Sequence, residues 1–195
     1  MRKFIFLLLF AFIILGTASA QETSEHLTFK GVPIDGNLSE YVAKMKQVGF
    51  AHVATQNGTA ILQGDFAGFK GCTIGVLTLK SVDVVNTIAV IFPSHNDWGP
   101  LERDYEQLKS MLTQKYGEPA DVVEQFQNKS NPDTNNAKLH ELYMDRCTWY
   151  TAFETPNGDI QLSLQKEEYG KCFVLLKYYD KINTDTVRSA AMDDL

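Results

Sequence analysis

The order of the predicted elements is the feature that most constrains the fold of this chain. One helix pattern is followed by several strand patterns, and this order occurs twice. Residues 37–49 predict the first helix, with apolar residues along one stripe and Gly49 as a stop signal. The turn pair Asn57-Gly58 then predicts a hairpin between the first two extended segments. The extended segments of this half are 50–55, 59–64, 72–79 and 82–92.

The same order restarts after Pro93. A second helix is expected from about Asp97 to Gly117, with leucines and Tyr105 recurring at helical spacing. The extended segments of this half are 120–126, 142–154, 160–164 and 172–179, separated by an exposed loop at 128–138 and followed by a short terminal helix or tail at 183–195.

Helix then strands, without strand–helix–strand alternation, predicts an α+β fold on an antiparallel sheet. We expect a first helix-plus-meander unit at 21–93 and a second at 94–182. The apolar stripes of both helices would pack on one face of a continuous sheet.

The first twenty residues have the composition of a cleavable signal peptide. Arg2 and Lys3 precede an apolar run at residues 4–15, which is shorter than the ~20 residues of a membrane span. Ala18 and Ala20 then supply the small residues of a signal-peptidase site. This pattern favours a signal peptide at 1–20 over a short membrane anchor or a buried helix. We expect a periplasmic or secreted mature chain without a membrane span.

Composition narrows the classes of partner. The whole chain has a formal net charge of −6, and removal of Arg2 and Lys3 with the signal changes it to −8. A net negative surface without basic clusters argues against nucleic acid and against anionic membranes. Twelve Phe and eight Tyr within a hydrophobic content of 44% indicate a folded chain.

Alternation sorts the residues of the last strands onto two faces. The apolar sets that should face the helices are Cys147, Trp149, Thr151 and Phe153 in one strand, and Cys172, Val174, Leu176 and Tyr178 in another. A disulfide between Cys147 and Cys172 is conceivable, but the strand at 160–164 would separate their strands by about 9–10 Å. Buried free thiols are therefore favoured, and Cys72 leaves the count of cysteines odd.

The opposite face carries the candidate binding residues. They are Tyr150, Phe173, Leu175 and Tyr179, among Thr148, Glu154 and Lys177. Aromatic side chains on a sheet face without helices over it are typical of recognition surfaces. An equally weighted alternative is that loops, the terminal helix or a second subunit cover these residues.

No catalytic, metal or cofactor site is predicted. The stretch beginning His140-Glu141 resembles H-E-x-x-H, but Met144 stands where the second zinc-binding imidazole is needed. The glycines at 64, 68, 71 and 75 join strand to strand, whereas phosphate-binding loops lead into a helix. The histidines at 26, 52, 95 and 140 are scattered, and none lies in a nucleophile motif.

The segment Tyr116-Gly117-Glu118-Pro119, the tandem order and the signal peptide together resemble an uncharacterised group of exported proteins from Gram-negative gut bacteria. The architecture is similar to the β-lactamase-inhibitor-protein-like fold, in which two helix-and-sheet repeats present a curved sheet face. Outer-membrane-assembly lipoproteins of the SmpA/OmlA type share one such unit, but this chain has no lipidation cysteine after its signal. The resemblance implies the fold and transfers no functional residue.

These patterns favour an exported, non-enzymatic protein whose open sheet face binds a protein or glycan partner. Two alternatives remain from the sequence. One is a small cell-envelope hydrolase with a dispersed active site, and the other is a structural homodimer joined through a sheet edge or face.

Overall fold

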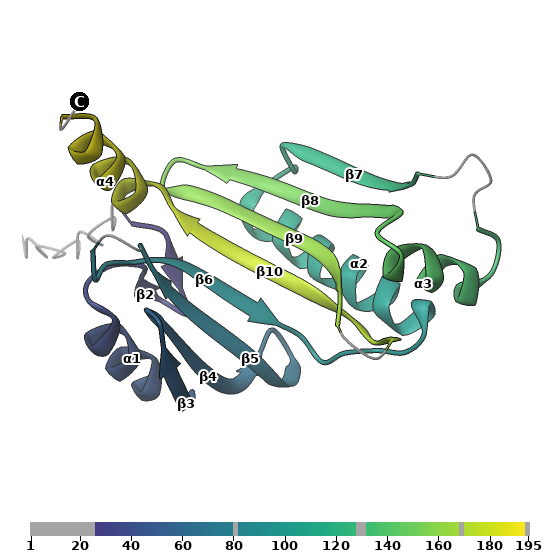
Figure 1. Cartoon of the computed structure of the whole chain (residues 1–195), viewed down its shortest axis with the longest axis horizontal. Helices are drawn as coiled ribbons and strands as arrows, with labels where there is room; N and C mark the ends of the chain where they lie inside the picture. Colours follow the sequence, from purple (N-terminus) through teal and green to yellow (C-terminus); the bar gives the residue numbers. More distant parts are fainter. Residues whose placement is uncertain (1–25, 80–81, 128–131, 168–169, 194–195) are drawn as a thin grey trace, which may run out of the picture.

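The computed structural model describes residues 26–79, 82–127, 132–167 and 170–193 (Figure 1). The predicted signal peptide at 1–20 lies outside the described residues, as does the 128–131 part of the predicted loop. Within the described ranges, no helix combines the length and apolar character that crossing a membrane requires.

One antiparallel sheet of eight strands organises the molecule, in the order β3-β4-β5-β6-β10-β9-β8-β7. The strands are β3 (Ala51–Gln56), β4 (Thr59–Phe66), β5 (Phe69–Thr78), β6 (Val85–Ile91), β7 (Asp121–Phe126), β8 (Cys147–Thr155), β9 (Gly158–Lys166) and β10 (Cys172–Asp180). Each half contributes a four-stranded meander, and the last strands of the halves, β6 and β10, pair antiparallel at the centre. The predicted α+β architecture of tandem helix-plus-meander units is confirmed.

Each meander follows a helix that begins at a capping side chain. Helix α1 (Leu38–Gln47) starts after Asn37, whose side chain accepts a 2.9 Å hydrogen bond from the backbone N–H of Glu40. Helix α2 (Trp98–Tyr116) starts after Asp97, which accepts from the N–H of Gly99. Gly117 ends α2 with a φ of 89°, a conformation that glycine adopts without strain.

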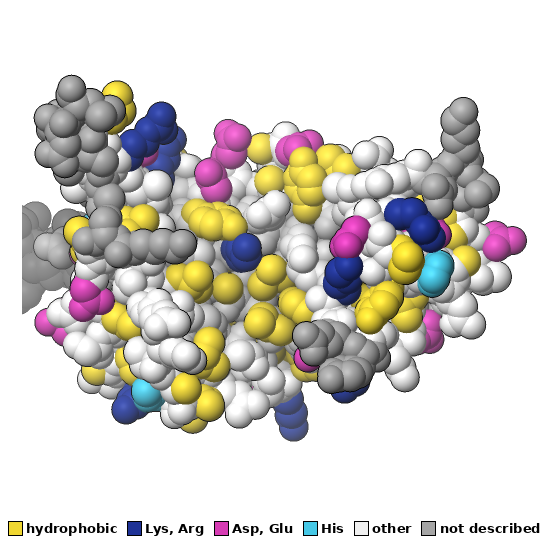
Figure 2. Space-filling model, in the orientation of Figure 1, with side chains coloured by type: hydrophobic (Ala, Val, Ile, Leu, Met, Phe, Trp, Pro, Cys, Tyr) yellow, Lys and Arg dark blue, Asp and Glu magenta, His cyan; other side chains and the backbone are white. Residues whose placement is uncertain are grey.

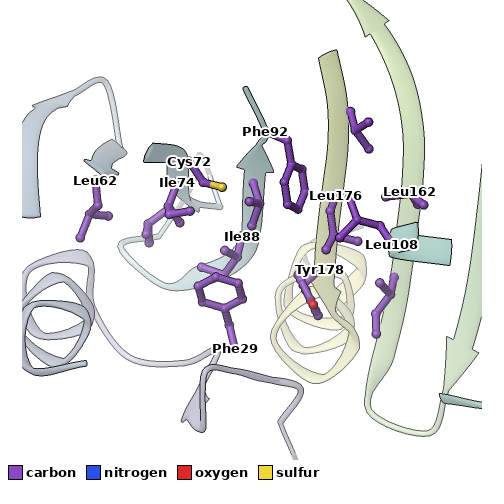
Figure 3. Packing of buried hydrophobic residues seen from close by; sticks show 14 of the residues in the cluster. Phe29, Leu62, Cys72, Ile74, Ile88, Phe92, Leu108, Leu162, Leu176 and Tyr178 are labelled. Atoms are coloured by element: carbon purple, nitrogen blue, oxygen red, sulfur yellow. The ribbon is translucent and has the colours of Figure 1, made fainter. Parts of the chain in front are cut away.

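The helices pack against one side of the sheet, which we call the covered face. Figure 1 shows α2 behind the strands of the second half. Leu108 of α2 lies beside Leu162 and Leu176 (Figure 3), and all three are buried. The hydroxyl groups of Tyr105 on α2 and Thr151 on β8 are 2.6 Å apart, so a hydrogen bond fixes helix to sheet. The apolar sets predicted to face the helices therefore do so.

The sequence patterns predict no helix or strand between residue 21 and α1, but the structure has two short strands there. They form a small hairpin, β1 (Thr28–Phe29) and β2 (Val32–Pro33), that buries its apolar side chains in the core. The ring of Phe29 lies 5.0 Å from that of Phe66. It lies 5.4 Å from the ring of Tyr178, and Figure 3 shows these two residues side by side. The tight turn at Lys30-Gly31, where both residues have positive φ, makes this hairpin possible.

The second half contains a helix that the sequence patterns missed. Residues predicted to be loop and strand form α3 (Asn135–Tyr143), and β8 begins at Cys147 instead of residue 142. Thr134 caps α3 by accepting from the N–H of Ala137, and α3 packs against α2. His140 and Glu141 are thus helical, but Met144 still stands in place of the second imidazole.

The predicted terminal helix is present as α4 (Lys181–Asp193). It begins directly after Asp180, the last residue of β10, whose fully buried carboxylate accepts from the N–H groups of Leu27 (2.8 Å) and Asn183 (2.9 Å). The side-chain amide of Asn183 in turn donates to the carbonyls of Ile34 and Val85. These contacts fasten the amino-terminal hairpin, the end of β10 and α4 to one another.

Candidate functional site

The predicted binding residues lie on the side of the sheet opposite the helices, which we call the open face. Phe173, Leu175 and Tyr179 of β10 and Tyr150 of β8 are all half-buried there, while their strand neighbours point into the core. Figure 2 shows this side of the molecule, where hydrophobic side chains form small separate patches between uncharged polar surface.

The strand register arranges this face in transverse rows, since residues opposite one another across a sheet point to the same side. One row comprises Ala51, Gln63, Thr73, Ile91, Leu175, Ser163, Tyr150 and Val123. The next row comprises Ala54, Ile61, Gly75, Ala89, Lys177, Gln161, Ala152 and Asp121. Small residues and uncharged amides and hydroxyls therefore predominate beside the predicted aromatic residues.

Large apolar side chains on the open face have little exposed surface. Ile91, at 37% exposure, is the most exposed of the large hydrophobic side chains on strands β6, β8, β9 and β10. Protein interfaces depend on a central cluster of well-exposed aromatic or aliphatic anchors. Among the described residues of these strands, such a cluster is not present.

A pocket of about 230 Å³ opens on this face over β8, β9 and β10. Ser163 forms its floor, because it is small and stands in register between Tyr150 and Leu175. Polar side chains supply most of the rim. The lining residues on the open face are Thr148, Tyr150, Gln161, Ser163, Gln165, Leu175 and Lys177.

Among the described residues that line this pocket, one is charged. Lys177 lies between Ala89 and Gln161 in the register, and its ammonium nitrogen is 5.9 Å from the centre of the Tyr179 ring. Within the described part of the chain, no carboxylate lies within ion-pairing distance of it. A cation with no carboxylate partner beside uncharged hydrogen-bonding groups can receive an anionic group of a ligand.

Tyr150, at the other side of the pocket, is held in place. Its hydroxyl donates a 2.5 Å hydrogen bond to the carboxylate of Asp121 on β7. This bond raises the pKa of Tyr150, so the phenol keeps its proton and its orientation. The ring edge therefore borders the pocket in a defined position.

The three cysteines are free thiols. Strand β9 lies between the strands of Cys147 and Cys172, as the predicted order requires, although Cys147 is half-buried instead of buried. Burial raises the pKa of Cys147 to about 12 and that of Cys172 to about 11. Both thiols are protonated near neutral pH, and a protonated thiol is a poor nucleophile.

Neither His52 nor His95 shows both halves of a nucleophilic triad among the described residues. His95 contacts the carboxylate of Asp104 at 2.7 Å, and no hydroxyl or thiol in the described ranges is hydrogen-bonded to its imidazole. His52 contacts the hydroxyl of Thr55 at 2.8 Å on β3, and no carboxylate among the described residues is bonded to its imidazole. The base–nucleophile and base–carboxylate halves of a triad thus lie on different elements.

Two further pockets lie away from the open face. One of about 410 Å³ lies between α1 and β3 beside His52, and one of about 390 Å³ lies between β7 and α3 beside Trp149. In the described ranges, no group of three or more His, Cys, Asp or Glu side chains is placed to hold a metal ion.

Sequence reasoning missed the β9 side of the site. Gln161, Ser163 and Gln165 were not singled out, yet they line the pocket floor and rim. The signal was the alternation with Ile160, Leu162 and Leu164, which are buried against the helices. Applying to this strand the face assignment used for its neighbours would have placed all three on the open face.

Comparison with protein-family models, with curated proteins and with solved structures gives no match. The resemblance to β-lactamase-inhibitor-protein-like proteins therefore stays a prediction.

Proposed function

We propose that this chain is an exported binding protein, acting in the periplasm or outside the cell, that recognises its partner through the open face without catalysing a reaction. The observation that carries the proposal is the contrast between the two sides of the sheet. Helices α1 and α2 cover one side, while Tyr150, Phe173, Leu175 and Tyr179 stay partly accessible on the other.

Two features favour binding over the hydrolase alternative. The thiols of Cys147 and Cys172 are protonated, and the contacts of His52 and His95 among the described residues do not join a nucleophile to a carboxylate. The polar groups that converge do so at the pocket over β9, where amides, hydroxyls and one ammonium offer hydrogen bonds. Such a set can orient a ligand and contains no evident base for proton abstraction.

The experiment is a binding comparison between the natural chain and a triple variant, Tyr150→Ala, Phe173→Ala, Tyr179→Ala. Each protein is immobilised and exposed to a cell-envelope fraction, and the bound material is quantified. Tyr143→Ala is the matched control, because this tyrosine is 39% exposed on α3, away from the open face. We expect the triple variant to lose the bound material and the control to keep it. Equal capture by all three proteins would contradict the proposal.

A further inference from the structure

We infer that the pocket over β9 binds a carboxylate-bearing sugar unit of a glycan, with Lys177 as the partner of the carboxylate. This inference rests on the proposed binding function of the open face and names its ligand class. The juxtaposition of Lys177, Gln161 and Thr148 around the Ser163 floor carries it.

The distribution of charged side chains on the open face favours a ligand with an isolated negative group. Lys177 is the cationic side chain on the open face of β6, β8, β9 and β10, within the described parts of these strands. Asp121, Asp159 and Glu154 stand at the rim of the same face. A densely anionic polymer would meet these carboxylates, whereas a single carboxylate at Lys177 avoids them.

The remaining groups match hydroxyl-rich ligands. Among described residues, no hydrogen bond is present for the side chains of Gln161, Thr148 and Lys177, so their donors and acceptors are available. A sugar ring has hydroxyls around its edge and C–H groups on its faces. The amides and hydroxyl can bind the edge, and the partly exposed ring of Tyr150, which lines the pocket, can contact a C–H face.

The size of the pocket agrees with one ring. Its volume of about 230 Å³ lies below the roughly 300–1,000 Å³ of sites that enclose drug-sized ligands. One unit of a longer glycan would occupy the pocket, and its neighbours would lie along the transverse row of Lys177 and Gln161, which also contains the small residues Ala89, Gly75 and Ala152.

An acidic peptide fits this place less well. Peptides on sheets gain affinity by pairing their backbone with an edge strand. Strands β9 and β10 are interior, and both of their edges are already paired with other strands. A peptide over the pocket would leave backbone N–H and C=O groups without partners, whereas sugar hydroxyls need side chains alone.

The test uses the purified chain on an array of glycans in matched pairs, each uronate- or sialate-bearing glycan beside the same glycan without its acidic sugar, together with triglutamate peptide. We expect the acidic members to bind roughly tenfold or more tightly, as one charge-assisted hydrogen bond implies. Lys177→Gln should abolish this preference. Lys171→Gln is the matched control, since this exposed lysine lies outside the pocket, and it should keep the preference.

Each contrary result has a defined meaning. Equal binding of neutral and acidic glycans, or a preference that survives Lys177→Gln, overturns the inference. In either case the proposed function stands if the double variant Tyr150→Ala, Tyr179→Ala abolishes glycan binding. Stronger binding of triglutamate, or no glycan bound, also overturns the inference and leaves the envelope-capture experiment to decide the function. Acidic-glycan binding that neither set of variants changes overturns both.

Discussion

On strand β10, consecutive side chains point to opposite sides of the sheet and have different surroundings. Leu176 is 1% exposed and packs under α2, whereas Leu175 is half-buried and borders the pocket. Tyr178 is 4% exposed beside Phe29, while Tyr179 lies under the ammonium group of Lys177. The residues of the covered face thus stabilise the fold. The residues of the open face contribute less to stability and are available for binding.

The largest effect should come from removing core volume at Leu176. We expect Leu176→Ala to lower the free energy of unfolding by about 2–5 kcal/mol, because it deletes buried methyl groups and leaves a cavity. Leu175→Ala, one residue away, should cost about 1 kcal/mol or less. Urea denaturation of both variants measures the difference. Equal losses would mean that the two faces are buried alike.

A slightly smaller loss is expected at Asp180. Asp180→Ala leaves the N–H groups of Leu27 and Asn183 without their buried acceptor, at a cost of about 1–3 kcal/mol. Asp159→Ala, on the rim of the open face, should change stability by about 0.5 kcal/mol or less. Thermal unfolding of the two variants measures the difference. A larger loss of stability in Asp159→Ala than in Asp180→Ala would contradict this account.

The covered face should also make the protein sensitive to alkali. Burial raises the pKa of Cys172 to about 11 and that of Cys147 to about 12, from an ordinary value of 9.0. The folded chain therefore holds these protons to higher pH than the unfolded chain, so this contribution is complete below pH 9.0 and declines as pH rises towards 11 and 12.

Urea midpoints at a series of pH values test this decline. A variant with Cys147→Val and Cys172→Val should lose less stability between pH 9 and pH 11 than the natural chain. Identical declines would show that the thiols are not its source.

The smallest effect on stability should come from the open face itself. Lys177→Gln removes a side chain without an ion pair among the described residues. The free energy of unfolding should therefore change by about 0.5 kcal/mol or less. Differential scanning calorimetry measures the change. A loss of several kcal/mol would show that Lys177 supports the fold instead of being available to a ligand.

Much of the covered face could be predicted from sequence, since apolar periodicity decides it. Leu101, Tyr105, Leu108 and Leu112 are buried along α2 as their spacing predicted, and Asn57-Gly58 forms the expected hairpin turn, with positive φ at both residues. The register that joins β6 to β10 could not be predicted, because it depends on how the two meanders meet.

The errors arose where local patterns are weak. Helix α3 has Asn135 and Asn136 in its first turn and one buried residue, Leu142, so its packing against α2 outweighs its low helix propensity. The hairpin at residues 28–33 consists of strands of two residues each, too short for alternation to be detected. The pairs Cys72-Thr73 and Cys147-Thr148 are alike in sequence, but they do not mark equivalent strands, because they lie in β5 and β8, the third and second strands of their meanders.

The central claim is that helices cover one side of the sheet while the other side is accessible to a ligand. Hydroxyl-radical footprinting of the purified chain, read by mass spectrometry, tests it through neighbouring or like residues on opposite faces. The account predicts faster oxidation of Tyr179 than of Tyr178, of Phe173 than of Phe153, and of Tyr150 than of Tyr105. Equal protection within these three pairs would contradict it.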